Sequence, residues 1–329
     1  MDYFEEKNYN AINIIAGSDY RKIDKLKQEN DSWTNILGKL KNNINPEEKW
    51  ADLENEGVRL ILKENPEYPS LLEEISWVPF GLYIKGSLPK GKAVGIVGTR
   101  KATSIGRDFA RKIAKELSSA GITIVSGLAM GIDESAHQGA LDAGGKTVAV
   151  MPTGLNKIYP AQNINLAKNI IDRGGALISE YPFNSPTYPA NFIQRNRIIS
   201  GLSLAVIVIE APEKSGALAT ARFALEQNRE IFVAPGQVNH PNYKGSHQLI
   251  RSGARIITSA EEVLEDLNIE YNKQDHQAAE ISGEEKEIFE IIKQIGWPAP
   301  IDKISQKTKI GIQKINQIIT FLTIKGLIK

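Results

Sequence analysis

The central part of the chain alternates short apolar runs with stretches whose apolar residues recur at helical spacing, and this alternation restricts the fold more than any other feature. The runs are rich in Val and Ile and rarely alternate with polar residues, which is typical of strands covered on both faces. They are residues 93–97, 122–125, 147–151, 176–178, 204–209, 231–234 and 255–257. Strands separated by helices form a parallel sheet with crossover connections, so we expect an α/β fold with a Rossmann-like, open, mostly parallel sheet.

The segments before this sheet are expected to form a helical module and an added sheet edge. Residues 1–56 are polar with apolar residues at helical spacing, which predicts an N-terminal helical module. We expect this module to be SAM-like or helix-hairpin-helix-like. Its turn at residues 17–22 could grip a DNA backbone as a helix-hairpin-helix does, but it lacks the usual pair of glycines, which favours a structural or protein-contact role. The core is predicted to span residues 57–267, with residues 58–62 and 82–86 as strands that extend the sheet.

The composition changes after the core. Residues 259–290 hold eleven Asp or Glu against two Lys, and we place an acidic linker at residues 268–283. The last predicted domain, residues 284–329, has helical stretches and an apolar ending at residues 321–328 that resembles the wing hairpin of a winged helix. From 303 to 329 there are six lysines and no acidic residue, a pattern that fits a solvated helix face and DNA contact about equally well.

Composition excludes several classes of protein. Lysine and arginine (40) balance aspartate and glutamate (39), so the net charge of +1 predicts no general attraction to nucleic acid or membranes, and any basic site has to be local. The chain has no cysteine, which excludes disulfides, thiolate zinc sites and cysteine nucleophiles and fits a reducing compartment. Neither an apolar run of membrane-spanning length nor a signal-peptide pattern is present, so we expect a cytoplasmic protein without membrane insertion.

Small, polar and charged residues follow the predicted strands where each strand ends. They are Gly98, Thr99, Arg100 and Lys101, then Ser126 and Gly127, Gly154, Ser179 and Glu180, Glu210, Ser215 and Gly216, and Pro235 and Gly236. In open parallel sheets, ligands gather outside these carboxyl ends. Glycines let backbone amides approach a phosphate, and the start of the following helix favours negative charge. Turns alone would explain any one of these glycines, but their recurrence at one edge favours an anion site.

Two arginines, Arg195 and Arg197, lie in a helix-like segment between two strand-like runs. A guanidinium has five donors and a permanent charge, so a buried arginine needs a phosphate or a carboxylate. Residues two apart lie on nearly opposite sides of a helix, so the two cannot serve one ligand in the same way. We hypothesise that Arg195, on the same face as Phe192, meets the ligand, and that Arg197 pairs with Glu180 or Glu210. Phe192 is either a core anchor or a stacking platform for a base.

No catalytic residue, metal site or cofactor is expected. Asp133 and His137 lie four apart, but Asp133 fits the role of a helix cap, and His137 fits that of a satisfied structural group because no further metal-spaced partner is present. Gly95, Gly98 and Gly106 do not make the Gly-x-Gly-x-x-Gly spacing, so a nicotinamide or flavin cofactor is discounted.

The order of these motifs resembles that of the DNA-processing protein A family, also called Smf. The similarity covers about residues 60–267 and rests on residues 95–100, 126–133, 136–137, 154–155, 159–160, 179–180, 195–203, 210–211, 215–221 and 235–236. It implies a Rossmann-like core that binds single-stranded DNA, forms homodimers and helps to load the RecA recombinase onto incoming strands in bacterial natural transformation. It implies binding and not catalysis.

The resemblance also implies a set of nucleic-acid-binding residues. They are Arg100, Lys101, Ser126, Gly127, Phe192, Arg195, Asn196, Arg197, Ser215, Gly216 and Lys244. Three positions depart from the family pattern: Ile193 replaces a common proline, and Ala161 and Pro189 stand where some members carry lysines. We therefore expect a pocket that is less basic than in those relatives.

Two other functions stay open. Nucleoside-monophosphate phosphoribohydrolases have a similar core, but their loop carries a catalytic glutamate three residues after a threonine, where this chain has Phe223 after Thr220. Glu180 or Glu210 would have to take its place. A transcription regulator that uses the C-terminal winged helix would instead bind duplex DNA without residues 57–267.

Overall fold

The computed structural model of the chain describes residues 3–270, 283–308, 310–324 and 327–328. The chain divides into two compact units, Met1–Asn268 and Ile269–Lys329. Most of the predicted acidic linker, residues 271–282, lies outside the described residues. Each unit is therefore described by itself.

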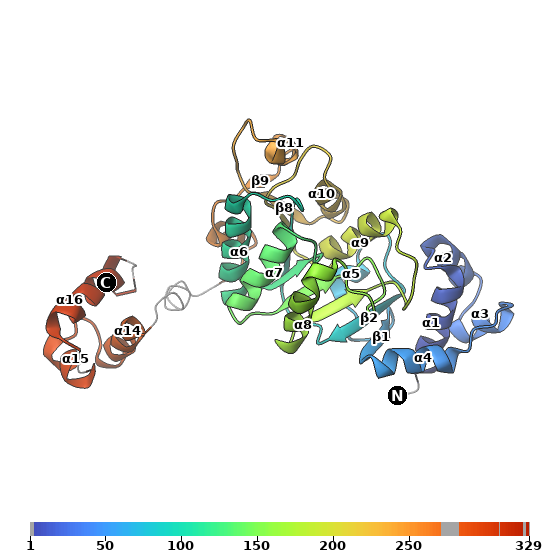
Figure 1. Cartoon of the computed structure of the whole chain (residues 1–329), viewed down its shortest axis with the longest axis horizontal. Helices are drawn as coiled ribbons and strands as arrows, with labels where there is room; N and C mark the ends of the chain where they lie inside the picture. The colour runs from blue at the N-terminus through green and yellow to red at the C-terminus, as the bar shows by residue number, and fades with distance from the viewer. Residues whose placement is uncertain (1–2, 271–282, 309, 325–326, 329) are drawn as a thin grey trace. The chain divides into compact units, whose positions relative to one another are not determined.

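The first unit is built around a sheet that has nine strands among the described residues (Figure 1). They are β1 (Val58–Leu62), β2 (Gly81–Gly86), β3 (Ala93–Val97), β4 (Thr123–Ser126), β5 (Thr147–Val150), β6 (Ala176–Ser179), β7 (Ala205–Val208), β8 (Glu230–Val233) and β9 (Arg255–Ile256). Their order is β1-β2-β6-β5-β4-β3-β7-β8-β9. The pairs from β6 to β9 are parallel, whereas β1 and β2 are antiparallel additions at one edge. The predicted Rossmann-like, mostly parallel sheet and its added edge are confirmed.

The chain reverses its direction of travel across the sheet at β3. From β3 it proceeds outward through β4, β5 and β6, and it then returns to β7 on the other side of β3 before continuing to β8 and β9. In register, Val94 of β3 pairs with Ile124 of β4 and with Ala205 of β7. Such a reversal leaves a crevice outside the carboxyl ends of the central strands, which is where open α/β sheets bind ligands.

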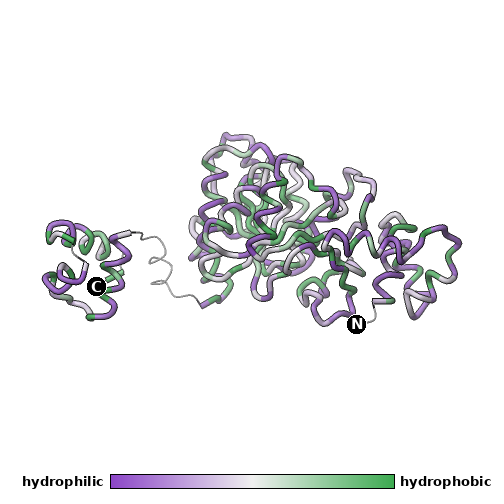
Figure 2. The backbone as a smooth tube through the Cα atoms, turned by 60° about the horizontal axis from the view of Figure 1, so that its bottom comes forward, coloured by the Kyte–Doolittle hydropathy of each residue, from purple (hydrophilic) through white to green (hydrophobic). Residues whose placement is uncertain are grey.

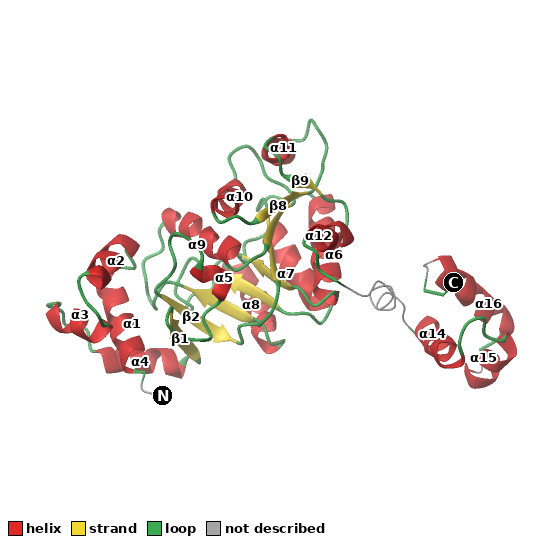
Figure 3. Cartoon of the chain, turned by 180° about the vertical axis from the view of Figure 1, so that it is seen from behind, coloured by secondary structure: helices red, strands yellow, loops and turns green. Residues whose placement is uncertain are grey.

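Helices cover both faces of this sheet. One face is covered by α6, α7 and α8 (Figure 1), and the other by α5, α9 and α10 (Figure 3). The helices of this region are α5 (Ser70–Glu73), α6 (Ser104–Ser119), α7 (Ile132–Asp142), α8 (Ile164–Asp172), α9 (Pro189–Gly201), α10 (Gly216–Glu226), α11 (Lys244–Arg251) and α12 (Ala260–Asp266). All residues of β3, β4, β5 and β7 are buried between these layers. Figure 2 shows hydrophobic positions gathered in these central strands, which explains their unalternated Val and Ile.

The N-terminal residues form helices α1 (Phe4–Ala16), α2 (Tyr20–Gln28), α3 (Trp33–Lys39) and α4 (Pro46–Asn55). Tyr9 and Trp33 belong to the same hydrophobic cluster as Tyr83 of β2, so these helices share a core with the added edge of the sheet. A buried hydrogen bond from Tyr83 Oη to Asn10 Oδ1, 2.8 Å, joins the two parts. A SAM-like or helix-hairpin-helix-like identity of these helices, and a domain boundary at residue 56, stay predictions.

The second unit contains helices α14 (Glu284–Ile295), α15 (Ile301–Thr308) and α16 (Ile312–Ile324). Ile288, Ile304, Ile315 and Leu322 form its core. The predicted wing hairpin at residues 321–328 is wrong in its first half, because residues 321–324 continue α16 and place Leu322 in that core; residues 325–326 lie outside the described residues. Among the helices that the structure describes, none is long and apolar enough to cross a membrane.

Candidate nucleic-acid interface

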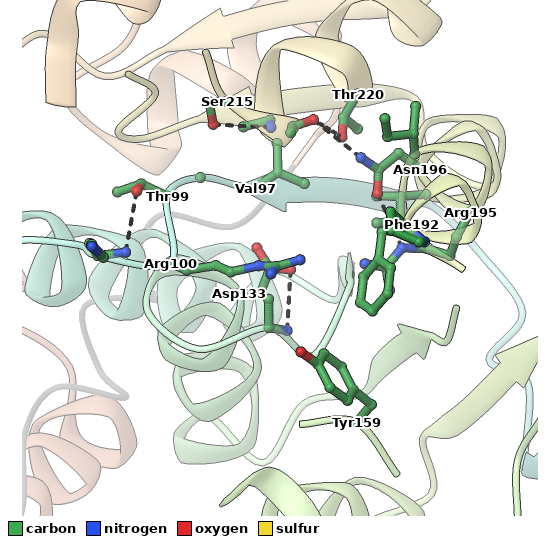
Figure 4. A pocket seen from close by; sticks show the side chains of 18 of the residues that line it. Val97, Thr99, Arg100, Asp133, Tyr159, Phe192, Arg195, Asn196, Ser215 and Thr220 are labelled. Carbon is green, nitrogen blue, oxygen red and sulfur yellow. Dashed lines mark hydrogen bonds between the residues drawn. The ribbon is translucent and has the colours of Figure 1, made fainter. Parts of the chain in front are cut away.

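A pocket of about 800 Å³ opens where β3, β4 and β7 end. Loops that follow these strands line it, together with the N-terminal halves of α9 and α10. The predicted residues that line it are Arg100, Lys101, Phe192, Arg195, Asn196, Ser215 and Gly216. Figure 4 shows several of them gathered from the loop after β3 and from α9 and α10. The pocket therefore occupies the switch point of the sheet and contains seven of the eleven predicted residues.

An aromatic pair and an arginine form one side of the pocket. The Arg100 guanidinium carbon lies 5.3 Å from the centroid of the Phe192 ring. The Tyr159 ring meets the Phe192 ring edge to face, with centroids 5.2 Å apart. Arg100 is exposed and Phe192 is partly exposed, so the Phe192 ring belongs to the pocket wall and not to the core. A cation next to a partly exposed aromatic ring suits both a phosphate and a stacked base.

Arg195 is buried and uses most of its donors on the protein. Its Nε donates to Asn196 Oδ1 at 3.1 Å, and its Nη1 donates to the carbonyls of Gly127 (2.9 Å) and Val150. Burial lowers the pKa of Arg195 to about 10, against the opposing attraction of Asp133. Arg195 therefore braces the loop after β4 against the end of β5, and within the described part of the chain only its Nη2 has no hydrogen-bond partner.

Arg197 lies on the other side of α9 and does not line the pocket. Its Nη1 and Nη2 donate to the two oxygens of Glu180 at 2.9 and 2.6 Å, and its Nε donates to the Trp77 carbonyl at 3.0 Å. The predicted pairing of Arg197 with Glu180 is confirmed. All three guanidinium nitrogens donate to oxygens of the protein, and Arg197 is not among the pocket-lining residues.

Glu210 is the alternative partner that the sequence suggested for Arg197, and it is engaged elsewhere. It accepts hydrogen bonds from the Thr103 amide and hydroxyl, from Asn242 Nδ2 at 2.8 Å and from Tyr243 Oη at 3.0 Å. Burial alone would raise the pKa of Glu210, but these donors outweigh it and lower the pKa below its usual value. Glu210 thus ties the loop after β3 to the segment before α11.

Asp133 is not the helix cap that the sequence suggested. Helix α7 begins after Gly131 without a side-chain cap, and Asp133 Oδ2 instead accepts from the Gly127 amide (3.1 Å) and the Ala129 amide (3.4 Å). The reason is that the loop after β4 folds back over the first turn of α7 and presents these amides to the side chain. Burial raises the pKa of Asp133, and Arg195 opposes this effect.

His137 is a satisfied structural group, as expected. Its Nε2 accepts from the Leu128 amide at 3.3 Å, and its Nδ1 lies 2.7 Å from Thr147 Oγ1, which itself donates to the Ile124 carbonyl. Burial, helped by the charge of Arg195, lowers the pKa of His137 to about 3. Within the described residues there is no group of three or more His, Asp or Glu side chains that could hold a metal ion.

The remaining predicted residues have different positions. Ser126 is buried and donates to the Ile96 carbonyl at 2.6 Å, whereas Gly127 lines a small cavity beside the main pocket. Ser215 Oγ accepts from the Ala217 amide and caps α10, which leaves the exposed Gly216 at the pocket. Lys244 is exposed at the start of α11 and is not among the pocket-lining residues.

Several lining residues were absent from the predicted set. They are chiefly Lys157, Tyr159, Lys214, Thr187 and Thr220. Lys214 directly precedes Ser215, and Lys157 follows the end of β5, so the rule that weights residues after strand ends would have found both. The two lysines restore positive charge that Ala161 and Pro189 do not supply.

Cationic side chains, a helix start and an aromatic wall thus meet at the switch point of a Rossmann-like sheet. Open α/β sheets bind anionic ligands at such a place. Residues 59–268 match the sequence profile of DNA recombination-mediator protein A, and the chain belongs to that family.

Relatives share both sequence and fold with the chain. Protein Smf of Escherichia coli is 42% identical over 217 residues, which are 65% of this chain and 58% of that protein. The DNA processing protein DprA of Bacillus subtilis is 41% identical over 229 residues, 68% of this chain and 77% of that protein. The chain spans less than two thirds of the length of the Smf proteins of E. coli and Synechocystis.

Solved structures of DprA proteins resemble the chain. The X-ray structure of DprA from Streptococcus pneumoniae superposes with a TM-score of 0.61 at 34% identity and covers 73% of this chain and 82% of that one. DprA from Helicobacter pylori, whose structure was described for its single-stranded DNA binding mode, gives a TM-score of 0.58 at 30% identity and covers 65% of this chain and 98% of that one.

Proposed function

We propose that this protein binds single-stranded DNA in the pocket at the switch point. One observation carries the proposal: the Arg100 guanidinium and the Phe192 ring, 5.3 Å apart, present a cation and an aromatic face to the same pocket. Single-stranded DNA offers both a phosphate and an unpaired base in each nucleotide. Stacking contributes roughly 1 to 3 kcal/mol per base, and every phosphate contact adds salt-dependent affinity.

In the cell, we propose a role in bacterial natural transformation and recombination. The protein would protect incoming single strands and help to load the RecA recombinase onto them. The name of the family, DNA recombination-mediator protein A, and the DNA processing relatives support this proposal. A homodimer and a cytoplasmic location are further parts of it. Light scattering at several protein concentrations would test the dimer, and strand exchange by RecA with and without the protein would test the loading.

The flanking helices are proposed to be accessory modules. The N-terminal helices would form a SAM-like or helix-hairpin-helix-like domain, and the C-terminal helices a winged-helix-like domain, beside a core of residues 57–267. Removal of residues 284–329 would test whether single-strand affinity depends on the C-terminal helices.

We further propose that the pocket binds its ligand without catalysis. Glu180 is held by Arg197, and Glu210 by Thr103, Asn242 and Tyr243, so neither is free to act as the general acid or base of a phosphoribohydrolase. Neither residue lines the pocket. Incubation with nucleoside monophosphates should release no free base. Release that depends on an intact pocket would instead support the hydrolase.

The central test is a binding titration by fluorescence anisotropy with the full chain. Single-stranded and double-stranded oligonucleotides of equal length are titrated over a series of salt concentrations. We expect a clear preference for the single strand and an affinity that falls as salt rises. Equal affinity for both forms, or tighter binding of the duplex, would favour a duplex-binding regulator and overturn the proposal.

A further inference from the structure

One carboxylate lies in a pocket that is otherwise cationic. Among the described residues that line it, Asp133 is the only one with an acidic side chain. The cationic ones are Arg100, Lys101, Lys157, Arg195 and Lys214. A carboxylate repels a phosphate and costs free energy to bury, so its position suits a part of the ligand that donates a hydrogen bond.

One oxygen of this carboxylate is available. The Gly127 and Ala129 amides both donate to Oδ2, which fixes the orientation of the group. No residue that the structure describes donates to Oδ1. Asp133 lines the pocket although only 6% of its surface is exposed, so Oδ1 is the oxygen that a ligand can use.

The side chain of Arg195, which approaches Gly127 as Asp133 does, has a free donor. Arg195 donates hydrogen bonds from Nε and Nη1 to oxygens of the protein, and its Nη2 has no partner in the described part of the chain. Both side chains press on Gly127: a Cβ atom at that position would lie 2.6 Å from Arg195 Nη2 and 2.8 Å from Asp133 Oδ2. The glycine therefore leaves room for both side chains, which line the pocket together with Phe192 (Figure 4).

We infer that Asp133 and Arg195 read the Watson–Crick edge of an unpaired base whose face rests on Phe192. Every nucleobase has a donor and an acceptor side by side on that edge, for example N3–H and O4 of thymine. Asp133 Oδ1 accepts from the donor, and Arg195 Nη2 donates to the acceptor. The inference rests on the proposed function and explains why the pocket would select single-stranded over double-stranded DNA. In a duplex the Watson–Crick edge of each base is occupied by its partner base, so it cannot bind Asp133 and Arg195.

The first test compares thymidine oligonucleotides on the wild-type protein. In one probe every base is N3-methylated, which removes the donor but leaves the ring free to stack. The matched control is a 5-ethyluracil oligonucleotide, which carries one extra carbon on the opposite edge. We expect roughly tenfold weaker binding of the N3-methylated probe and nearly unchanged binding of the 5-ethyl probe. Equal affinity for all three would overturn the inference while leaving single-strand binding established. If none of the three bound, the proposed function itself would fail.

The second test uses Asp133→Asn. The Gly127 and Ala129 amides require an acceptor at the position of Oδ2, so the amide oxygen takes that place and the amide nitrogen replaces Oδ1. The acceptor in the pocket thereby becomes a donor. We expect the variant to lose its discrimination between thymidine and N3-methylthymidine.

An electrostatic role for Asp133 makes a different prediction. If the carboxylate only repelled phosphates, Asp133→Asn would bind all single strands more tightly and keep the discrimination of the wild type, and that result would overturn the inference. An abasic oligonucleotide separates the two roles, because it has phosphates but no base edge. Thermal melting checks that the variant is folded, and the wild-type comparison decides the inference even where the variant is not.

Discussion

Arg197 and Glu180 form a doubly hydrogen-bonded ion pair inside the protein, with Nη1–Oε1 and Nη2–Oε2 distances of 2.9 and 2.6 Å. Only 4% of the Arg197 side chain and 13% of the Glu180 side chain are exposed. The pair joins α9 to the end of β6, and the bond from Arg197 Nε to the Trp77 carbonyl adds the segment before β2. It holds the helix that presents Phe192 and Arg195 to the pocket.

Arg197→Ala should therefore act on stability. Breaking a buried pair leaves an uncompensated charge, so we expect the free energy of unfolding to fall by about 3 to 5 kcal/mol. Arg59→Ala is the matched control, because Arg59 forms an exposed pair with Glu67 and should lose at most about 1 kcal/mol. Urea denaturation measures both values. Native-like stability of Arg197→Ala together with lost DNA binding would mean that Arg197 meets the ligand after all.

Arg100→Ala should weaken single-strand binding for every sequence. Arg100 is exposed at the pocket, and a lost phosphate contact lowers the slope of log K against log salt by about 0.7 for a single strand. Anisotropy titrations across a salt series measure the slope for the wild type, for Arg100→Ala and for the control Arg59→Ala. An unchanged slope in Arg100→Ala would remove Arg100 from the phosphate path.

Phe192→Ala should reduce affinity by a different route. Loss of a stacking platform costs roughly 1 to 3 kcal/mol per base, and because no charge is removed, the salt slope should stay the same. Phe192→Tyr keeps the ring and is expected to retain most of the affinity. If Phe192→Ala changed the slope and not the affinity at low salt, its effect would come from displaced Arg100, which lies over the same ring.

The sheet and the place of the pocket could be predicted from the sequence because both depend on local patterns. Buried parallel strands leave unalternated apolar runs, and β3 occupies the predicted residues 93–97. The weight given to residues after strand ends predicts the place of the pocket, which opens at the carboxyl ends of β3, β4 and β7. Helix geometry predicts that Arg195 and Arg197 lie on different sides and that Arg197 pairs with Glu180 or Glu210; the structure selects Glu180.

The remaining errors concern contacts made by residues distant in sequence or by backbone groups. The carbonyl of Val150, which accepts from Arg195 Nη1, has no signature in the sequence. Asp133 looked like a helix cap because it lies near a helix start, and only the fold of the loop shows that the Gly127 and Ala129 amides hold it. A short apolar run such as residues 321–324 suits a strand and a buried helix turn equally well, so the sequence pattern does not distinguish a wing from the end of α16.

His137 should make the stability of the protein depend on pH. Its pKa is lowered to about 3 in the folded protein, compared with about 6.5 in an unfolded chain. Well above pH 6.5 both states are neutral at this residue and stability is at its full value. As the pH falls through 6.5, His137 becomes protonated in the unfolded chain but stays neutral in the folded protein. The free energy of unfolding therefore decreases until the folded His137 also becomes protonated near pH 3.

Between about pH 7 and about pH 5.5, His137 should lower the free energy of unfolding by about 1 kcal/mol. The folded protein excludes the proton because Nε2 already accepts from the Leu128 amide and Nδ1 is taken by Thr147, so a second N–H would face a donor. Urea denaturation at several pH values measures the loss. His137→Gln cannot titrate, and we expect it to be less stable at neutral pH but to show a flatter curve over this range. Parallel curves for the two proteins would show that another group carries the pH dependence.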